Sequence, residues 1–413
     1  MSAPEAIDGT HDPFEEFNRR TGAGVVEDPY PLLAINRAKG PVLKENLEAE
    51  LLSAEVDPQA TMGPEVFTAF SYDAVQTVLR DGETFSSAGY ADVMGAVMGH
   101  TILEMDEPEH HTYRGLVQQA FSRKAMERWE EEAVGPIVDE CIDAFIERGN
   151  AELVRELTLP FPVNVIASML GLPREDLPQF HRWAIELISV SFDWDLGTRA
   201  SAQLRDYFAR VLADRRAHPA NDLMSTLAAS ELDGQHLTDE EIFAFLRLLL
   251  PAGAETTYRS SSNLLFGLLT NPAQLDALRA DRALMPQAIE EGLRWEPPLT
   301  TIVRTATRDT VVDGVDIPSG AIVITNMGSA NHDEKYWEHS EEFDIHREQR
   351  QHLAFAFGPH MCLGMHLARM ETRVVLERIF DRLPNLRLDP AADDPHITGM
   401  TFRAPPSLPV LFG

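Results

Sequence analysis

Cysteine is scarce in this chain, which has two among 413 residues. So low a count argues against a framework of disulfide bonds and is typical of proteins from a reducing compartment. One of them, Cys141, lies in the segment 136–146, whose apolar residues have helical spacing, and we interpret it as a core residue. The other, Cys362, lies in a turn rich in glycine and proline.

Positive charge and long apolar runs are also lacking. The chain has 35 Lys and Arg against 66 Asp and Glu, a formal net charge of −31. Sequence-independent binding to nucleic acid needs basic patches, so we expect no nucleic-acid partner. No apolar run approaches the length of a membrane span, and residues 1–20 lack the basic and apolar parts of a signal peptide. We therefore expect a cytoplasmic protein with no membrane span.

No linker, repeat or low-complexity tract divides the sequence. Its hydrophobic content of 44% with 24% charged residues is ordinary for a globular protein with one large core. We therefore predict a single domain, residues 1–413, although the length alone would allow two or three. The spacing predicts a mainly α fold with a minor β portion near 65–70, 300–326 and 395–413, the last as a hairpin.

The segment 355–364 reads Phe-Ala-Phe-Gly-Pro-His-Met-Cys-Leu-Gly and precedes helical spacing over 363–383. At the start of a helix, the helix dipole and the free amide groups favour the thiolate form of a cysteine. A thiolate presented in this way suits a soft or redox-active metal, and haem iron is one standard partner. The alternative is that Cys362 is a small buried hydrophobe, as most free cysteines are.

The longest predicted helix, 239–270, contradicts local helix rules at its centre. It begins after Thr238, which opens a capping box, and ends before Pro272. The stretch 251–257 reads Pro-Ala-Gly-Ala-Glu-Thr-Thr, where Pro251 removes a helix hydrogen bond and polar groups would be buried. Such a conflict indicates function. The alternative is a kink beside a buried water.

Three further sequence features are weak evidence of function when each is taken alone. His110 and Arg114 stand four residues apart on one predicted helix face, and such a pair is usually a solvated surface feature. Glu291 and Arg294 form an i,i+3 pair of a kind that exposed helices commonly carry. The stretch 86–105 is predicted to be irregular and is unusually apolar, so it is either a covered surface segment or a pocket wall.

In this order, the motifs resemble those of the cytochrome P450 superfamily, in particular its soluble bacterial class. The Cys segment matches the family loop Phe-x-x-Gly-x-His-x-Cys-x-Gly, with Ala356 where a second glycine is common. Ala-Gly-x-Glu-Thr-Thr at 252–257, Glu-x-x-Arg at 291–294 and Phe-Asp…Arg at 343–347 stand in the expected order. Pro251 is a second departure, since an aliphatic residue is commoner there. The resemblance implies haem between the long central helix and the helix after the Cys segment.

The resemblance also implies roles for individual residues. Cys362 would bind the metal as the proximal ligand to the iron of haem b. Glu255 and Thr256 would be the catalytic acid–alcohol pair, with the Thr256 hydroxyl bonded to the Ala252 carbonyl and Glu255 relaying protons. The cofactor's propionates would contact four basic residues: His110, Arg114, Arg304 and His360. A buried ion network with a folding role would comprise Glu291, Arg294 and Arg347.

The implied activity is that of a haem-thiolate monooxygenase, which inserts one oxygen atom of O2 into an apolar small molecule. Its electrons would come from a ferredoxin and a ferredoxin reductase that uses NAD(P)H. A haem-binding sensor or electron-transfer protein would need Cys362 but not Glu255 and Thr256, and a peroxide-using peroxygenase usually lacks that pair. The ferredoxin is expected to dock on a basic patch formed by Arg123, Lys124, Arg369 and Arg373.

The implied substrate pocket is apolar. It would draw on the stretches 86–105 and 180–196, on Leu248, Pro251 and Ala252, and on 300–302 and 400–401. Its loops carry no cluster of Arg or Lys, so an anionic group would be buried unpaired, whereas each buried CH₂ contributes about 0.8 kcal/mol. We therefore expect a neutral, terpenoid- or steroid-like substrate, with at most one oxygen met by Thr300, Thr301 or Thr401.

Overall fold

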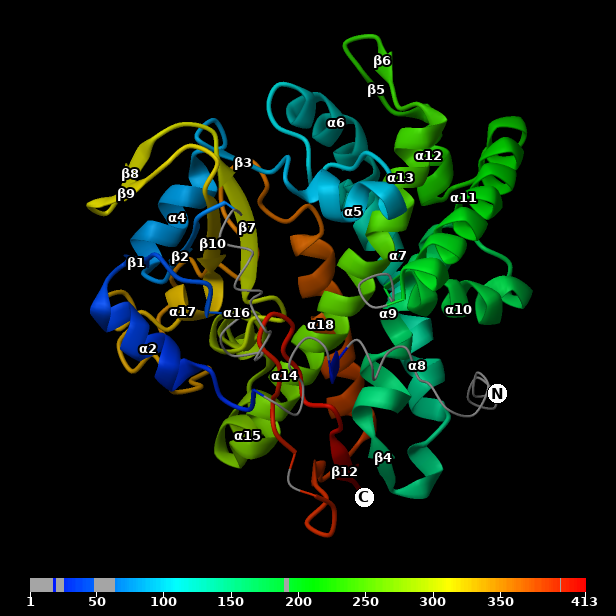
Figure 1. The fold of residues 1–413 in the computed structure, drawn as a ribbon. Helices are drawn as coiled ribbons and strands as arrows, with labels where there is room; N and C mark the ends of the chain where they lie inside the picture. The colour runs from blue at the N-terminus through cyan, green and yellow to red at the C-terminus, as the bar shows by residue number, and fades with distance from the viewer. Residues whose placement is uncertain (1–17, 20–25, 48–63, 189–192, 394) are drawn as a thin grey trace.

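Helices make up most of the chain, as its apolar spacing predicts. The structure, a computed structural model, describes residues 18–19, 26–47, 64–188, 193–393 and 395–413 (Figure 1). Its α-helices are α2 (Tyr30–Lys39), α4 (Tyr72–Arg80), α5 (Tyr90–Met98), α6 (Glu109–Gln118), α7 (Arg123–Trp129), α8 (Gly135–Asp143), α9 (Pro160–Met169), α10 (Leu177–Ile188), α11 (Trp194–Ala217), α12 (Leu223–Ala229), α13 (Asp239–Leu250), α14 (Thr256–Thr270), α15 (Pro272–Ala280), α16 (Met285–Trp295), α17 (Met327–Ala330) and α18 (Met365–Arg382). Within these described ranges, no helix is long and apolar enough to cross a membrane.

The predicted helix 239–270 runs through the middle of the molecule as three consecutive pieces (Figure 1). α13 begins at the predicted capping box, in which the Thr238 N–H donates to Glu241 Oε2 at 2.7 Å. A π-helical segment, Pro251–Glu255, follows, and α14 continues the path. Proline cannot donate a hydrogen bond to the preceding turn, so the helix widens at this point instead of ending.

The helix predicted after the Cys segment is also present. α18 lies inside the predicted range 363–383 and packs against α8, α14 and α16. Leu367, Val374 and Ile379 are among its buried residues, in agreement with the helical spacing. The two helices that carry the motifs therefore pack against each other through the core.

Strands account for a small part of the chain, so the prediction of a mainly α fold with a minor β portion is confirmed. They are β1 (Val42–Leu43), β2 (Val66–Ala69), β3 (Phe85–Ser86), β4 (Asn150–Glu152), β5 (Glu231–Leu232), β6 (Gln235–His236), β7 (Thr301–Ala306), β8 (Thr310–Val312), β9 (Val315–Ile317), β10 (Ile322–Asn326), β11 (Arg387–Leu388) and β12 (Pro409–Leu411). The largest sheet has the order β1-β2-β10-β7-β3, and only β2 and β10 are parallel in it. The strands expected near 65–70 and 300–326 belong to this sheet.

The C-terminal hairpin predicted over 395–413 is wrong in its pairing. β12 pairs with β11 on one side and with β4 on the other, so its partners lie outside the tail. Within the tail, a single bridge joins Thr398 to Ala404. Alternation along one strand indicates which residues face the core, but it does not identify the neighbouring strand.

The stretch 86–105 is also more regular than predicted, because α5 occupies Tyr90–Met98. This helix is apolar on most of its surface, and therefore lacks the polar–apolar alternation from which helices are recognised. Val97 and Met98 are buried in the main core. Val97 and Met98 are therefore covered, and the pocket wall over the rest of the stretch stays a prediction.

Candidate active site

The Cys segment is a tight loop that places Cys362 just before α18. The Cys362 N–H donates to the Phe355 carbonyl at 2.9 Å, which closes the loop. Gly358 has a φ of +73°, and a Cβ there would lie 2.5 Å from the Leu79 carbonyl oxygen, so glycine is required. Ala356 also has a positive φ, +59°, which costs an alanine about 1–2 kcal/mol. The alanine at this family position therefore strains the loop that holds Cys362.

Two opposing effects act on the thiol of Cys362. Burial among protein atoms raises its pKa, while the Gly364 N–H and the guanidinium groups of Arg114 and Arg369 lower it. The net direction is upward, so the helix end does favour the thiolate, as expected, but burial outweighs it unless the sulfur binds a metal ion. Coordination to a metal ion deprotonates a thiol outright, and Cys362 keeps the accessible surface that a ligand needs.

The four basic residues expected to contact the cofactor converge beside this loop. The His110 and His360 rings lie 4.1 Å apart between centroids, and Arg114 Nη2 donates to the Met361 carbonyl at 2.7 Å. Burial, followed by the charges of Arg304, His110 and Arg114, lowers the pKa of His360 to about 3. Residues from α6, β7 and the Cys loop are thus brought into one cluster.

This basic cluster has acids on one side, with Asp106 acting on Arg304, and one unpartnered nitrogen within the described part of the chain. His110 Nδ1 lies 3.1 Å from Glu107 Oε1, but among the described residues the buried Nε2 of His110 has no hydrogen-bond partner. Burial lowers the pKa of Arg304, as expected for a cation held in a low-dielectric environment. Cations packed together in this way are stabilised by an anion. The two propionates of haem fit this requirement, so the residues present fit the implied cofactor.

The polar segment of the long helix adopts the arrangement that the motif implies. Thr256 Oγ donates to the Ala252 carbonyl at 2.6 Å, inside the π-helical turn. A Cβ on Gly253 would lie 3.2 Å from the Ile166 side chain, so α9 packs closely against this turn. The carbonyl of Ala252 is left free by the backbone hydrogen bonds of the helix and accepts from the Thr256 hydroxyl instead. This arrangement produces a small polar notch.

Glu255 has a partner that the sequence analysis missed. It is 6% exposed, and its Oε1 accepts from Arg259 Nε at 2.8 Å and from Arg259 Nη2 at 2.5 Å. Arg259 also donates to the side chain of Asn18. The i,i+4 spacing of Glu255 and Arg259 was the available signal. The acid is therefore anchored by a buried arginine beside the notch.

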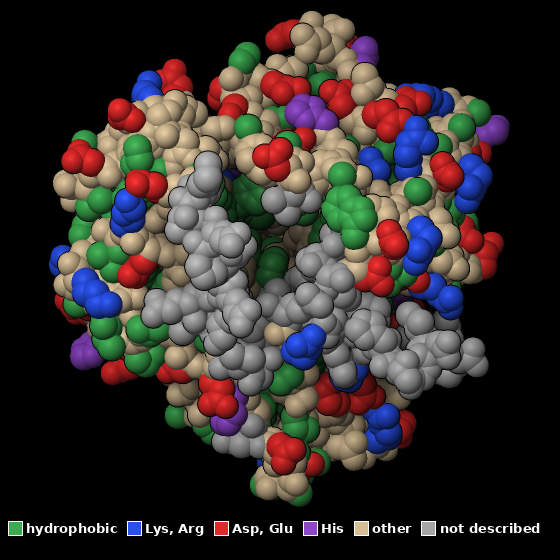
Figure 2. Space-filling model, in the orientation of Figure 1, with side chains coloured by type: hydrophobic (Ala, Val, Ile, Leu, Met, Phe, Trp, Pro, Cys, Tyr) green, Lys and Arg blue, Asp and Glu red, His purple; other side chains and the backbone are tan. Residues whose placement is uncertain are grey.

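The face shown in Figure 2 is hollowed near its centre, with hydrophobic side chains inside the hollow. Of the residues expected to line the pocket, Leu248 and Phe180 are buried, and 189–192 lie outside the described residues. Met400 packs in a separate core cluster, and the Thr300 hydroxyl donates to its carbonyl at 2.6 Å. The Thr300 hydroxyl therefore already donates its proton within the protein, and the Met400 side chain is packed in the core.

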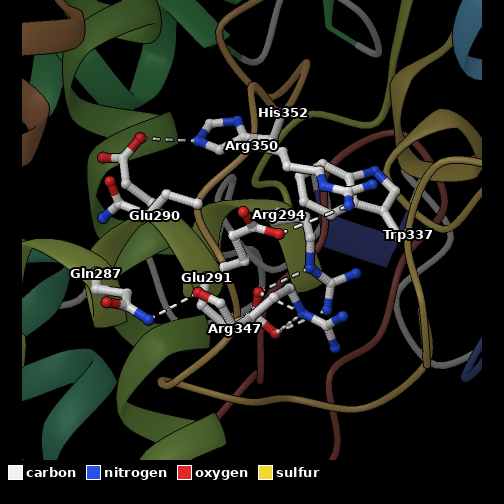
Figure 3. A pocket seen from close by; sticks show the side chains of 10 residues that line it. Gln287, Glu290, Glu291, Arg294, Trp337, Arg347, Arg350 and His352 are labelled. Carbon is white, nitrogen blue, oxygen red and sulfur yellow. Dashed lines mark hydrogen bonds and ion pairs between the residues drawn. The ribbon is translucent and has the colours of Figure 1, made fainter.

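The predicted ion network surrounds a small pocket beneath the Cys loop (Figure 3). Arg294 Nε and Nη2 each donate to the Glu291 carboxylate at 2.8 Å, and Arg347 Nε donates to it at 3.2 Å. Arg294 also donates to three backbone carbonyls, those of Asn331, Ser340 and Glu342. Glu291 is 4% exposed and Arg294 is 1% exposed. This network fixes the loops that precede the Cys segment.

The neighbouring Glu290 holds a second network that the sequence analysis missed. Arg369 donates to its two carboxylate oxygens at 2.6 and 2.8 Å, and His352 Nε2 lies 3.2 Å away. Burial alone would raise the pKa of Glu290, but hydrogen bonds from Arg369 and His352 bring it to about 2. Arg369 also stacks over Phe355, 4.5 Å from its ring centroid. Helix α16 is therefore tied to both α18 and the Cys loop.

Glu371 is a buried acid at the contact between α18 and α14, and it makes stability depend on pH. Burial raises its pKa to about 8, against a smaller lowering by the Thr257 hydroxyl. Since this folded-state pKa lies above the unfolded value, the associated stability is full below about pH 4 and is lost as pH rises through about 8. The advantage of Glu371→Gln over the parent protein should therefore grow between pH 5 and pH 8, by more than about 1 kcal/mol.

Urea unfolding of both proteins at several pH values measures this effect. Glu131→Gln is the control, because Glu131 is exposed and has no ion pair among the described residues. A Glu371→Gln advantage of the same size at every pH would contradict the prediction.

Comparison with known proteins agrees with the geometry. The family model described as Cytochrome P450 matches residues 163–408. A steroid C26-monooxygenase of Mycobacterium tuberculosis is 39% identical over 334 residues, 79% of this chain and 88% of that protein. The monooxygenase PikC of Streptomyces venezuelae is 33% identical over 376 residues, 89% of this chain and 87% of that protein.

Solved structures show the same relationship. The structure of CYP109E1 from Bacillus megaterium in complex with testosterone has a TM-score of 0.83 and 31% identity, covering 94% of this chain and 99% of that one. The matched relatives are monooxygenases, which confirms the oxygenase interpretation over a sensor or an electron carrier. The chain belongs to the cytochrome P450 family and is a haem b monooxygenase that uses O2 and a small-molecule substrate.

Proposed function

We propose that this protein hydroxylates an apolar small molecule of terpenoid or steroid type, with Cys362 as the ligand to haem iron. The observation that carries the site assignment is the basic cluster around the unpartnered Nε2 of His110, next to a cysteine that keeps accessible surface. The steroid class is supported by relatives: a steroid C26-monooxygenase, and CYP109E1, solved with testosterone and with corticosterone.

The residues of the site have separate proposed roles in the reaction. When bound, haem supplies the iron centre for O2 chemistry, which a thiolate ligand directs toward O–O cleavage. The anionic propionates of the cofactor would be held by the basic cluster of His110, Arg114, Arg304 and His360. Thr256 holds the notch open through its bond to Ala252 and offers a hydroxyl for an ordered water. Glu255, anchored by Arg259, relays protons toward that water.

A ferredoxin, with its NAD(P)H-dependent reductase, is the proposed electron donor, and it would dock near the Cys loop. The basic patch expected there carries little net charge, because three of its four cations are ion-paired. These pairs are Arg123–Glu127, Arg369–Glu290, Arg373–Glu130 and Arg373–Glu377. Shape and apolar contact therefore have a larger part in this docking than the sequence suggests.

The proposed reaction is tested with purified holoprotein, a bacterial ferredoxin, its reductase and NAD(P)H. A panel of steroids and terpenoids, neutral and acidic, is first screened for a shift of the ferric Soret band. Ligands that respond are then incubated under isotopically labelled O2, and one labelled oxygen atom is expected in the product. A panel in which no steroid or terpenoid shifts the band would reject the proposed substrate class.

Removing the Thr256 hydroxyl should uncouple the reaction without disturbing the fold. In Thr256→Ala, haem content and substrate binding should stay near those of the parent, because among the described residues the hydroxyl is hydrogen-bonded to the Ala252 carbonyl, one turn earlier along the same helical path. Consumption of NAD(P)H should continue while product falls, with electrons diverted to peroxide or water. The measurement is product formed per NAD(P)H consumed, and Thr256→Ser, which keeps the hydroxyl, is the control. A fully coupled Thr256→Ala would remove Thr256 from proton delivery.

A further inference from the structure

Strand β7 carries Arg304, and one of its two edges lacks a strand neighbour at Val303 among the described residues. On that edge β3 pairs with Thr305 and Ala306 alone, whereas β10 pairs with residues 301–305 on the other edge. The Val303 N–H donates instead to the Tyr90 hydroxyl at 3.0 Å. The side chain of Tyr90, from α5, thus takes the place of a strand partner at this point.

Arg304 and Tyr90 both contact the backbone of Val303. Arg304 Nη1 donates to the Val303 carbonyl at 2.8 Å, and in a strand the N–H and the carbonyl of one residue point toward the same edge. Burial lowers the pKa of Arg304, and Tyr90 and Asp106 act against it, Tyr90 also through a hydrogen bond to the Arg304 side chain. Arg304 is 4% exposed. Its guanidinium is therefore held between α5 and the loop that precedes α6.

The first turn of α5 is fixed beside this edge of β7. The Tyr90 N–H donates to the Ser87 carbonyl at 3.1 Å, and the Ser87 N–H donates to Asp106 Oδ1 at 2.9 Å. A Cβ on Gly89 would lie 3.1 Å from Thr305 Oγ1, which is closer than an ordinary contact. The loop before α5 thus lies directly against the strand, and Tyr90 has little freedom to move away from it.

We propose that Tyr90 is a positioning residue, which holds Arg304 in the orientation that binds a propionate of the cofactor. The proposal rests on the proposed function, in which Arg304 is one of four basic residues at that anionic edge. An arginine side chain has many rotamers, and ordering them when an anion binds costs free energy. The Tyr90 hydroxyl orders the guanidinium in advance, so binding of the propionate requires less ordering.

The same contact couples α5 to the cofactor. Tyr90 lies at the start of this helix, and Val97 and Met98 at its end are buried in the main core. Whatever holds Arg304 in place therefore also holds the start of α5, through the Tyr90 hydroxyl. Loss of either member of this pair should loosen the helix as well as the grip on the cofactor.

Haem retention tests the positioning role. The haem-loaded protein is mixed with an excess of apomyoglobin, and transfer of haem is followed by the Soret absorbance. Tyr90→Phe should release haem about two- to tenfold faster than the parent protein, the effect expected when one hydrogen bond is lost. Tyr207→Phe is the control and should keep the parent rate, because its hydroxyl donates to Asp176 Oδ2, at 2.6 Å, away from the basic cluster.

A double variant separates positioning from a general loss of stability. Arg304→Met should release haem faster than Tyr90→Phe, and adding Tyr90→Phe to Arg304→Met should change nothing further, because Tyr90 acts through Arg304. Should Arg304→Met retain no haem, Arg304→Lys takes its place, and the effect of Tyr90→Phe should again be smaller than in the parent protein. Independent effects that multiply in the double variant would overturn the proposal.

The single variants distinguish this proposal from the proposed function. A parent rate in Tyr90→Phe with a faster rate in Arg304→Met would reject the role of Tyr90 alone. A parent rate in Arg304→Met would reject the propionate contact as well.

Amide hydrogen exchange of the haem-loaded proteins tests the coupling to α5. The amides of residues 94–98 should exchange faster in Tyr90→Phe and in the Arg304 variant than in the parent protein, and at the parent rate in Tyr207→Phe. Unchanged exchange over this helix in both the Tyr90 and the Arg304 variants would show that Tyr90 does not couple α5 to the cofactor.

Discussion

Replacing Cys362 by histidine should abolish the red-shifted Soret band that the reduced, carbon monoxide-bound protein is expected to show. That band would depend on ligation of the iron by a thiolate, so replacing the thiolate by an imidazole should move it. The four basic residues that would hold the propionates are untouched by this substitution, and haem should still be taken up. The measurement is the reduced difference spectrum with carbon monoxide, normalised to the haem content of each variant.

Cys141→Ala supplies the matched control for this experiment. Cys141 lies on α8, where burial raises the pKa of its thiol to about 12, so it stays protonated and inert. Its replacement should leave the band intact. The opposite pattern, with the band lost in Cys141→Ala and kept in Cys362→His, would show that the ligand has been assigned to the wrong cysteine.

Arg294→Leu should remove a large part of the stability of the fold, although Arg294 belongs to the ion network and is not one of the proposed catalytic residues. Its guanidinium donates both to Glu291 and to three backbone carbonyls. Removal of one partner from a buried pair leaves the other charge uncompensated and costs about 3–5 kcal/mol, out of a typical total of 5–15 kcal/mol. The urea midpoint should fall steeply, or the variant should fail to accumulate as a haem protein.

A double variant and an exposed control complete this test. Arg294→Leu combined with Glu291→Leu should lose less than the sum of the two single variants, because no unpaired charge remains. Arg350→Leu should change stability by about 1 kcal/mol or less, since its pair with Glu348 and its hydrogen bond to the Tyr336 carbonyl are both exposed. An Arg294→Leu midpoint equal to that of Arg350→Leu would contradict a folding role for the network.

Elements with strong local signals were predicted well from the sequence. The capping box at Thr238 and the proline at 272 fix the ends of the long helix, and both act through neighbours within four residues. By contrast, α5 has no polar face to reveal its period, and β12 finds its partners far along the chain. Information of that kind depends on packing, which a single sequence does not contain.

The residues of the site show the same contrast between local interactions, which were predicted, and long-range packing, which was not. The bond from Thr256 to Ala252 is local and was predicted, as was the pairing of Glu291 with Arg294. The effect of the helix end on Cys362 was predicted, but the larger effect of desolvation was not, because desolvation depends on everything packed around the side chain.

The pairing of β12 with β4 also constrains how the protein is made. β4 ends at residue 152, and its partner strand ends at residue 411. At about 5–20 residues per second, a ribosome needs on the order of 10 to 50 s to synthesise the chain between them. During that interval β4 has a free edge open to wrong partners, although helices formed by local contacts can already assemble. Completion of this small sheet therefore comes late in synthesis, after the helices between β4 and β12 have been made.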